Sequence, residues 1–228
     1  MNKTDGFELA AALLTLLGEP VPHSENAVAP AEELLRRRSD ARRAVLDAVR
    51  VCGTPKTPRE FYLCTKLYGR LGRQYDAKTA ESAAAYLASP GWEELPRGKE
   101  EVRGVSVDLS VRNRAGIFAD LGTARAGLGD DAGACSAYGK AYALEPFRVG
   151  YAVQLADALA RSGRVGEALE FLTEQKKSPY YPAARYRGVT GEIRRDSSFR
   201  DMLDARIEEM KKRLNRLERA APNESRSK

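Results

Sequence analysis

Apolar residues recur every three to four positions along most of this sequence, which is the period of an α-helix. No segment carries a clear strand pattern, so we predict an all-α protein. Glycine, proline and polar residues separate the predicted helices. We expect helices from Thr4/Asp5 to Gly18, over 31–52, over two stretches of 58–88 divided at Gly72, over 110–128, 131–144, 148–162 and 165–177, briefly after Pro182, and over 198–219.

Two segments interrupt this pattern. Residues 19–30 are rich in proline and polar side chains, which is typical of a linker. Residues 89–107 keep no single period and are predicted to be an irregular insertion, with Trp92 packing it onto the helices. The last residues, APNESRSK, are predicted to be a polar, disordered tail.

The sequence repeats itself with a shift of 34 residues, a period that indicates a helix–turn–helix unit. Small residues at two of the matched positions would let paired helices approach closely, and the matched glycines would end the first helix of each pair with a positive φ. The matched pairs are Leu121/Leu155, Gly122/Ala156, Gly129/Gly163, Ala134/Ala168 and Tyr138/Leu172.

These residues resemble the tetratricopeptide repeat family, with Phe118, Leu121-Gly122, Ala134, Tyr138, Ala141 and Pro146 at the family's motif positions. Arg125 departs from the motif, where the family has an aromatic residue. The resemblance implies a right-handed helical solenoid of about three repeats, at 58–91, 115–148 and 149–182, with an insertion at 92–114. Residues 1–57 would form a helical extension, 183–219 capping helices, and 220–228 the tail.

Composition points away from several kinds of chemistry. Lys and Arg number 38 against 32 Asp and Glu, a net charge of +6 that is modest for a nucleic-acid binder. The three cysteines fit neither a disulfide framework nor zinc spacing, and there is one histidine, His23. No run of about 18 apolar residues is present, and Asp5 and Glu8 are unfavourable in a signal peptide. We therefore expect a cytoplasmic protein with no catalytic residues, metal or cofactor.

The resemblance also implies a function. Tetratricopeptide units act as scaffolds whose concave groove holds a protein or peptide, and here the groove would be basic at one end, which suits an acidic partner. By the family's pattern, the groove positions with functional side chains are Arg59, Tyr62, Lys66, Arg70, Thr123, Asp157 and Arg161.

Three alternatives remain open from the sequence. The arginine-rich segment 31–52 would bind nucleic acid if its arginines were not neutralised by interleaved acids. The 89–111 insertion would form an enzyme site if it built a deep polar pocket near Trp92. The 198–219 helix carries leucines, Ile207 and Met210 at coiled-coil-like spacing, which fits either docking onto the last repeat or pairing with a second copy in a homodimer.

Overall fold

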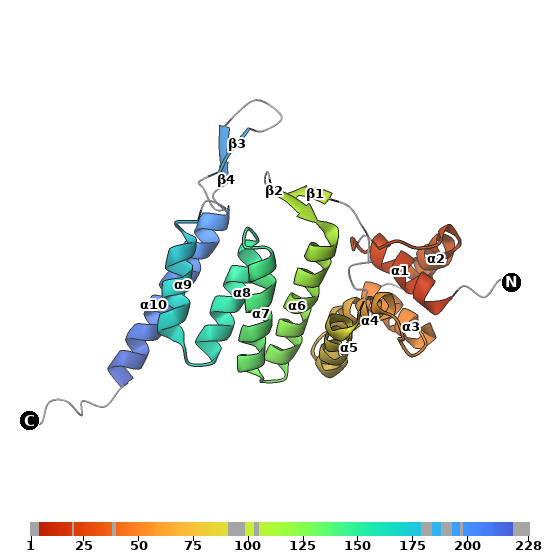
Figure 1. The fold of residues 1–228 in the computed structure, drawn as a ribbon, viewed down its shortest axis with the longest axis horizontal. Coiled ribbons are helices and arrows are strands. Elements are labelled where there is room, and N and C mark those ends of the chain that lie inside the picture. Colours follow the sequence, from red (N-terminus) through yellow and green to blue (C-terminus); the bar gives the residue numbers. More distant parts are fainter. Residues whose placement is uncertain are drawn as a thin grey trace, which may run out of the picture. The chain divides into compact units, whose positions relative to one another are not determined.

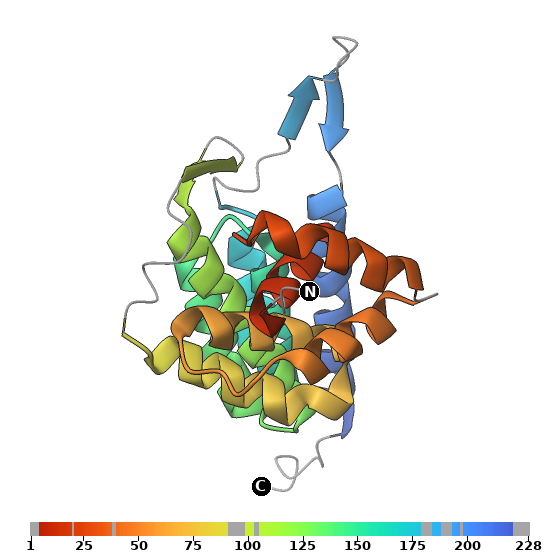
Figure 2. The ribbon, with the colours of Figure 1, turned by 90° about the vertical axis from the view of Figure 1, so that its right-hand side faces the viewer.

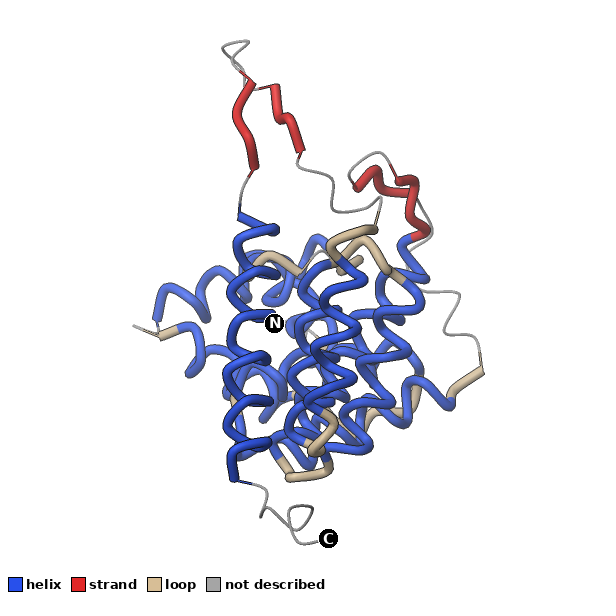
Figure 3. The backbone as a smooth tube through the Cα atoms, turned by 90° about the vertical axis from the view of Figure 1, so that its left-hand side faces the viewer, coloured by secondary structure: helices blue, strands red, loops and turns tan. Residues whose placement is uncertain are grey.

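The computed structural model describes residues 5–19, 21–37, 40–90, 99–102, 105–178, 184–187, 193–196 and 198–220. The chain divides into two compact units, Met1–Asp130 and Asp131–Lys228. Apart from two short strand pairs and the connecting loops, the described residues form helices (Figure 3). The predicted all-α class is confirmed, whereas a solenoid arrangement stays a prediction.

The first unit contains most of the helices (Figure 1). They begin where the sequence supplies caps: the Asp5 side chain accepts a hydrogen bond from Phe7 N, and Thr57 and Glu60 form a reciprocal capping box ahead of α4. Its elements are α1 (Gly6–Leu16), η1 (Glu25–Ala27), α2 (Val28–Arg37), α3 (Ala41–Val51), α4 (Pro58–Leu71), η2 (Arg73–Tyr75), α5 (Asp76–Ala88), β1 (Lys99–Val102), β2 (Val105–Asp108) and α6 (Leu109–Gly127).

Helix α1 lies at the centre of the first unit's packing. It contacts α2, α3 and α4, and its Leu13 and Leu14 side chains are fully buried. At its first residue, Gly6 lies so close to α3 that a Cβ atom there would stand 2.2 Å from Val51 O. The N-terminal extension is therefore part of the hydrophobic core rather than an appendage.

The second unit consists of α7 (Asp131–Leu144), α8 (Val149–Arg161), α9 (Val165–Gln175), β3 (Ala184–Arg187), β4 (Ile193–Asp196) and α10 (Ser198–Ala220). Helices consecutive along the chain pack against each other, and α10 packs on α9 and α8. The turn between α8 and α9 uses Gly163 at φ 86°, where a left-handed conformation favours glycine. Helix α10 buries Leu203, Ile207 and Met210, so it docks within the unit, one of the two alternatives for this helix, while Leu217 stays half exposed.

Two predictions about secondary structure are wrong. Within the segment predicted to be irregular, β1 and β2 pair antiparallel, with Val102 opposite Val105. The short helix expected after Pro182 is absent from the described residues, which there form the antiparallel pair β3 and β4, so α10 is the one capping helix described (Figure 2). Strands of four residues contain too few positions to set up a recognisable period. Trp92 and the 221–228 tail lie outside the described residues.

A third correction concerns segment 31–52, which was predicted as one helix. It forms α2 and α3 instead, because Asp40 adopts an extended conformation and its side chain accepts a hydrogen bond from Arg42 N, capping a new helix. Helix α2 also begins inside the predicted linker, with Pro30 in its first turn, where no intrahelical N–H bond is required. None of the described helices is both long enough and apolar enough to cross a membrane.

Candidate partner-binding site

Helix α4 presents the first group of predicted groove residues on a single face. Arg59, Tyr62, Lys66 and Arg70 are separated by three or four residues, so their side chains lie in one row along the helix. We call these four residues the α4 face. The capping box and Pro58 at the first helical position define where the helix starts, so all four residues lie within regular helix.

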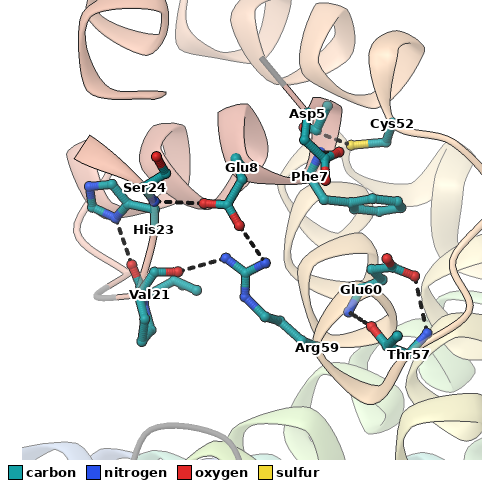
Figure 4. Close-up of polar contacts among 12 residues, drawn as sticks. Asp5, Phe7, Glu8, Val21, His23, Ser24, Cys52, Thr57, Arg59 and Glu60 are labelled. Carbon is teal, nitrogen blue, oxygen red and sulfur yellow. Dashed lines mark hydrogen bonds and ion pairs between the residues drawn. The ribbon is translucent and has the colours of Figure 1, made fainter. Parts of the chain in front are cut away.

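The chain's own N-terminal segment covers the α4 face at Arg59 (Figure 4). Its guanidinium forms an ion pair with Glu8 at 2.8 Å and donates a hydrogen bond to Pro22 O at 2.7 Å. Glu8 also accepts a hydrogen bond from Ser24 N at 2.6 Å. Burial opposes the charge of Glu8, but these hydrogen bonds and the positive charge of Arg59 lower its pKa below the ordinary value.

The same segment covers the other end of the face. Arg70 donates to Leu17 O at 3.2 Å and lies 3.7 Å from the carboxylate of Glu19. Lys66 lies 3.9 Å from the same carboxylate. We call residues 17–19 and 21–24 the N-terminal strap. Three of the four side chains of the α4 face thus bind α1 or the strap, so the chain itself covers much of this face, and partner binding there stays a prediction.

The strap is held in shape by contacts with α1. Gly18, at φ 89°, ends the helix, and Glu19 N then donates to Leu14 O at 2.9 Å. Thr15 Oγ1 accepts a hydrogen bond from Val21 N at 3.1 Å, and His23 Nδ1 lies 2.8 Å from Val21 O. His23 is partly buried in this network. These contacts fold the strap back onto the helix before it reaches α4.

An ion pair from α6 completes the middle of the face. Lys66 Nζ lies 2.8 Å from Asp120 Oδ2 and 5.7 Å from the centre of the Tyr62 ring. Burial lowers the pKa of Lys66, but Asp120 and the other surrounding groups raise it more, so the net pKa lies above the ordinary value. Burial also raises the pKa of Asp120, against the opposing effect of Lys66. Tyr62 is 5% exposed, and its burial raises its pKa.

Two cavities remain beside the strap. One of about 230 Å³ brings together three predicted residues, Lys66, Arg70 and Thr123, with Asp120 at its wall. The hydroxyl of Thr123 donates to Ala119 O at 3.0 Å. The second cavity, of about 460 Å³, is lined by Tyr62 and by Arg112 from α6. The structure therefore brings five of the seven predicted residues into one region of the first unit.

The remaining two predicted residues belong to the second unit. Asp157 on α8 lies 2.9 Å from Arg206 of α10, and burial raises its pKa, against the opposing effect of Arg206. Arg161 lies 2.9 Å from Asp131 and is exposed. Both side chains therefore have partners within their own unit, and Arg161 is the one that stays at the surface.

Sequence reasoning missed the groups that occupy the α4 face, namely Glu8, Leu17, Glu19, Pro22 and Asp120. One signal was available, because the basic row on α4 is complemented by acidic residues in the N-terminal segment. The backbone oxygens that bind Arg59 and Arg70 left no such signal. Among the described residues, no cluster of three or more His, Cys, Asp or Glu side chains is placed to hold a metal ion.

These features define an all-α protein in which an N-terminal segment covers a basic helix face. Compared with known protein families, the sequence matches no family model, and it matches no curated protein.

Proposed function

We propose that the protein is a non-catalytic scaffold, similar to tetratricopeptide repeat proteins, that holds a protein or peptide partner. The observation that carries this proposal is the α8–α9 pair. The two helices pack against each other across a short turn at Gly163, and the small residues Ala156 and Ala168, one on each helix, are both fully buried. Small buried residues allow close helix approach, which is what the 34-residue pattern requires.

Helices α4 and α5 support the same interpretation in the first unit. They are consecutive, pack against each other, and meet at Gly72, whose φ is 82°. Helix pairs of this kind bury one side against their neighbours and leave the other available for a partner. We also place the protein in the cytoplasm, a proposal supported by Cys52, Cys64 and Cys135 all being unpaired thiols.

Nucleic-acid binding by segment 31–52 has less support. Arg36 and Arg37 both pair with Glu33. Arg42 donates to Leu71 O, and Arg50 pairs with Asp47. These arginines have partners in the chain, and the six arginines of 31–52 stand against four acidic residues, so the net charge of +2 is modest for binding a phosphate backbone.

The test is affinity capture from a lysate of the protein's own cells, followed by direct binding of each captured protein after purification. A Tyr62→Ala, Lys66→Glu variant is unsuitable as the probe, because Tyr62 is buried and Lys66 is paired with Asp120. Exposed Arg161 is better: Arg161→Glu should weaken capture, whereas Arg219→Glu at the end of α10 should not.

The proposal predicts a protein partner whose binding resists nuclease treatment. Recovery of nucleic acid alone, abolished by nuclease and falling steeply with added salt, would support the alternative instead. Recovery of nothing above the empty matrix would reject both.

A further inference from the structure

An open groove in the second unit carries an inference about the partner. The groove has a volume of about 680 Å³ and is formed by residues of α7, α8 and α9. None of the sequence-predicted groove residues lines it, and the strap lies in the other unit. We call it the α9 groove.

One wall of the α9 groove is acidic. Glu167, Glu170 and Glu174 follow one another along α9 at spacings of three and four residues, so they share one side of the helix. Glu167 pairs with Arg164, and Glu174 pairs with Lys177, both through exposed side chains. Glu170 is exposed and has no basic partner among the described residues. Arg164 also lines the groove, so the lining carries three negative charges and one positive charge, a net charge of −2 along about 10 Å of helix, with Glu170 as the unpaired acid.

The rest of the lining is of a different character. Leu155 and Leu159 of α8 and Phe171 of α9 line the groove with apolar side chains, and the Phe171 and Tyr142 rings meet edge to face with their centroids 5.2 Å apart. The α7 wall consists of small side chains, including Cys135 and Ser136. Small residues let another backbone approach closely, while the leucines and the phenylalanine favour apolar contacts.

We infer that the α9 groove binds an amphipathic helix with basic residues along one edge. The apolar side chains of such a helix would cover Leu155 and Phe171, and its lysines or arginines would face the three glutamates. The length of the acidic row corresponds to about two helical turns of the ligand. This inference rests on the proposed scaffold function and specifies the chemistry of one partner.

The experiment measures binding of three fluorescent peptides of about 14 residues to the full-length protein by anisotropy. The first has leucines at helical spacing with lysines elsewhere, the second has glutamates in place of the lysines, and the third has the first peptide's composition in scrambled order. We expect the first peptide to bind more tightly than the other two, and its affinity to fall as salt is added.

Two variants locate the binding. Glu170→Lys should weaken the first peptide roughly tenfold, and Ser136→Trp, which fills the groove from the α7 side, should weaken it without a change of charge. The matched control is Glu218→Lys, the same substitution at an exposed position of α10 that does not line the groove. Circular dichroism establishes that each variant retains its helices.

Equal binding of the lysine and glutamate peptides, or equal binding of the scrambled peptide, would overturn the inference. So would unchanged binding to both Glu170→Lys and Ser136→Trp. The capture experiment with Arg161→Glu tests the proposed scaffold function separately, because Arg161 does not line the α9 groove.

Discussion

The α4 face and the α9 groove are both surfaces of packed helices, yet one is filled by the chain and the other is open. The α4 face binds groups as far back as Glu8 and Leu17, 51 and 53 residues earlier in the chain than Arg59 and Arg70. The α9 groove is formed by neighbouring helices alone and has no covering segment among its lining residues. The difference shows that the local sequence determines which side chains share a helix face. Distant parts of the sequence determine which groups bind to that face.

The two regions also differ in how their charges are held. Lys66 of α4 contacts Glu19 of the strap and Asp120 of α6, and its side chain is 13% exposed. The glutamates along α9 form their pairs at the surface, where solvent weakens the interaction. The charged groups of the first region therefore join segments of the fold, whereas those of the second face solvent, with Glu170 unpaired.

The largest expected effect tests whether α1 is an integral part of the first unit's hydrophobic core. Leu13→Ala in α1 empties a fully buried position and should lower the free energy of unfolding by about 3 kcal/mol. Leu155→Ala in the lining of the open α9 groove should cost about 1 kcal/mol, because the side chain is partly exposed already. Urea unfolding followed by circular dichroism measures both, and equal losses would contradict the comparison.

The second effect concerns the ion pairs of the two regions. Asp120→Ala leaves the poorly exposed Lys66 without its nearest carboxylate and should cost about 3 kcal/mol. Arg206→Ala breaks the more exposed pair with Asp157 and should cost about 1 kcal/mol or less. Thermal unfolding compares the two variants.

A double variant tests the cause of the Asp120 effect. Lys66→Met combined with Asp120→Leu replaces the pair by apolar side chains and should recover most of the stability lost in Asp120→Ala. If the double variant is less stable than Asp120→Ala, the loss arises from packing rather than from an uncompensated charge.

Most of the helices could be predicted from the sequence because their signals are local. The boundaries of α7 were predicted correctly, and those of α8 and α9 to within one or two residues, since each helix is flanked by glycine or a polar turn. The break between α2 and α3 was missed, because it depends on the conformation of Asp40, which interrupts an otherwise continuous apolar stripe. The strand pairs were missed because strands of four residues show no period.

The candidate site was predictable only in part. The family's pattern placed Arg59, Lys66 and Arg70 at groove positions, and in the structure their helical spacing puts them on one face of α4. Nothing in that spacing indicated that Glu19 and the carbonyl of Pro22 would bind them, since such contacts depend on where the strap leaves α1. The positions of backbone acceptors follow from the fold and are not encoded in residue type.

The third prediction uses glycines that differ between the regions. Gly6→Ala would bring a Cβ atom to 2.2 Å from Val51 O and should destabilise the first unit by roughly 1–3 kcal/mol. Gly139→Ala lies inside α7, where a Cβ atom would meet nothing within 4 Å, and should stabilise by about 0.5–1 kcal/mol. Thermal unfolding should therefore give shifts of opposite sign, and a loss of stability in Gly139→Ala would contradict the interpretation of an uncrowded α7.

The smallest effect is the pH dependence that Glu8 contributes in the first unit. The pKa of Glu8 is lowered in the folded protein, so folding favours its charged form, and the stabilisation is present above the unfolded pKa of about 4.5. It is lost as the pH falls through the lower folded pKa, because protonation removes the ion pair with Arg59 and weakens the bond from Ser24 N.

Glu8→Gln should remove this dependence at a cost of about 1 kcal/mol or less at pH 7, with the difference from wild type shrinking below pH 4.5. Unfolding measured between pH 3 and pH 7 gives the two curves. Converging curves at low pH would show that the carboxylate of Glu8 holds the strap to Arg59 through its charge. A constant separation between the two curves would mean that the glutamine side chain disturbs packing instead. The α4 face would then be covered through apolar contacts of α1 rather than through its ionic contacts.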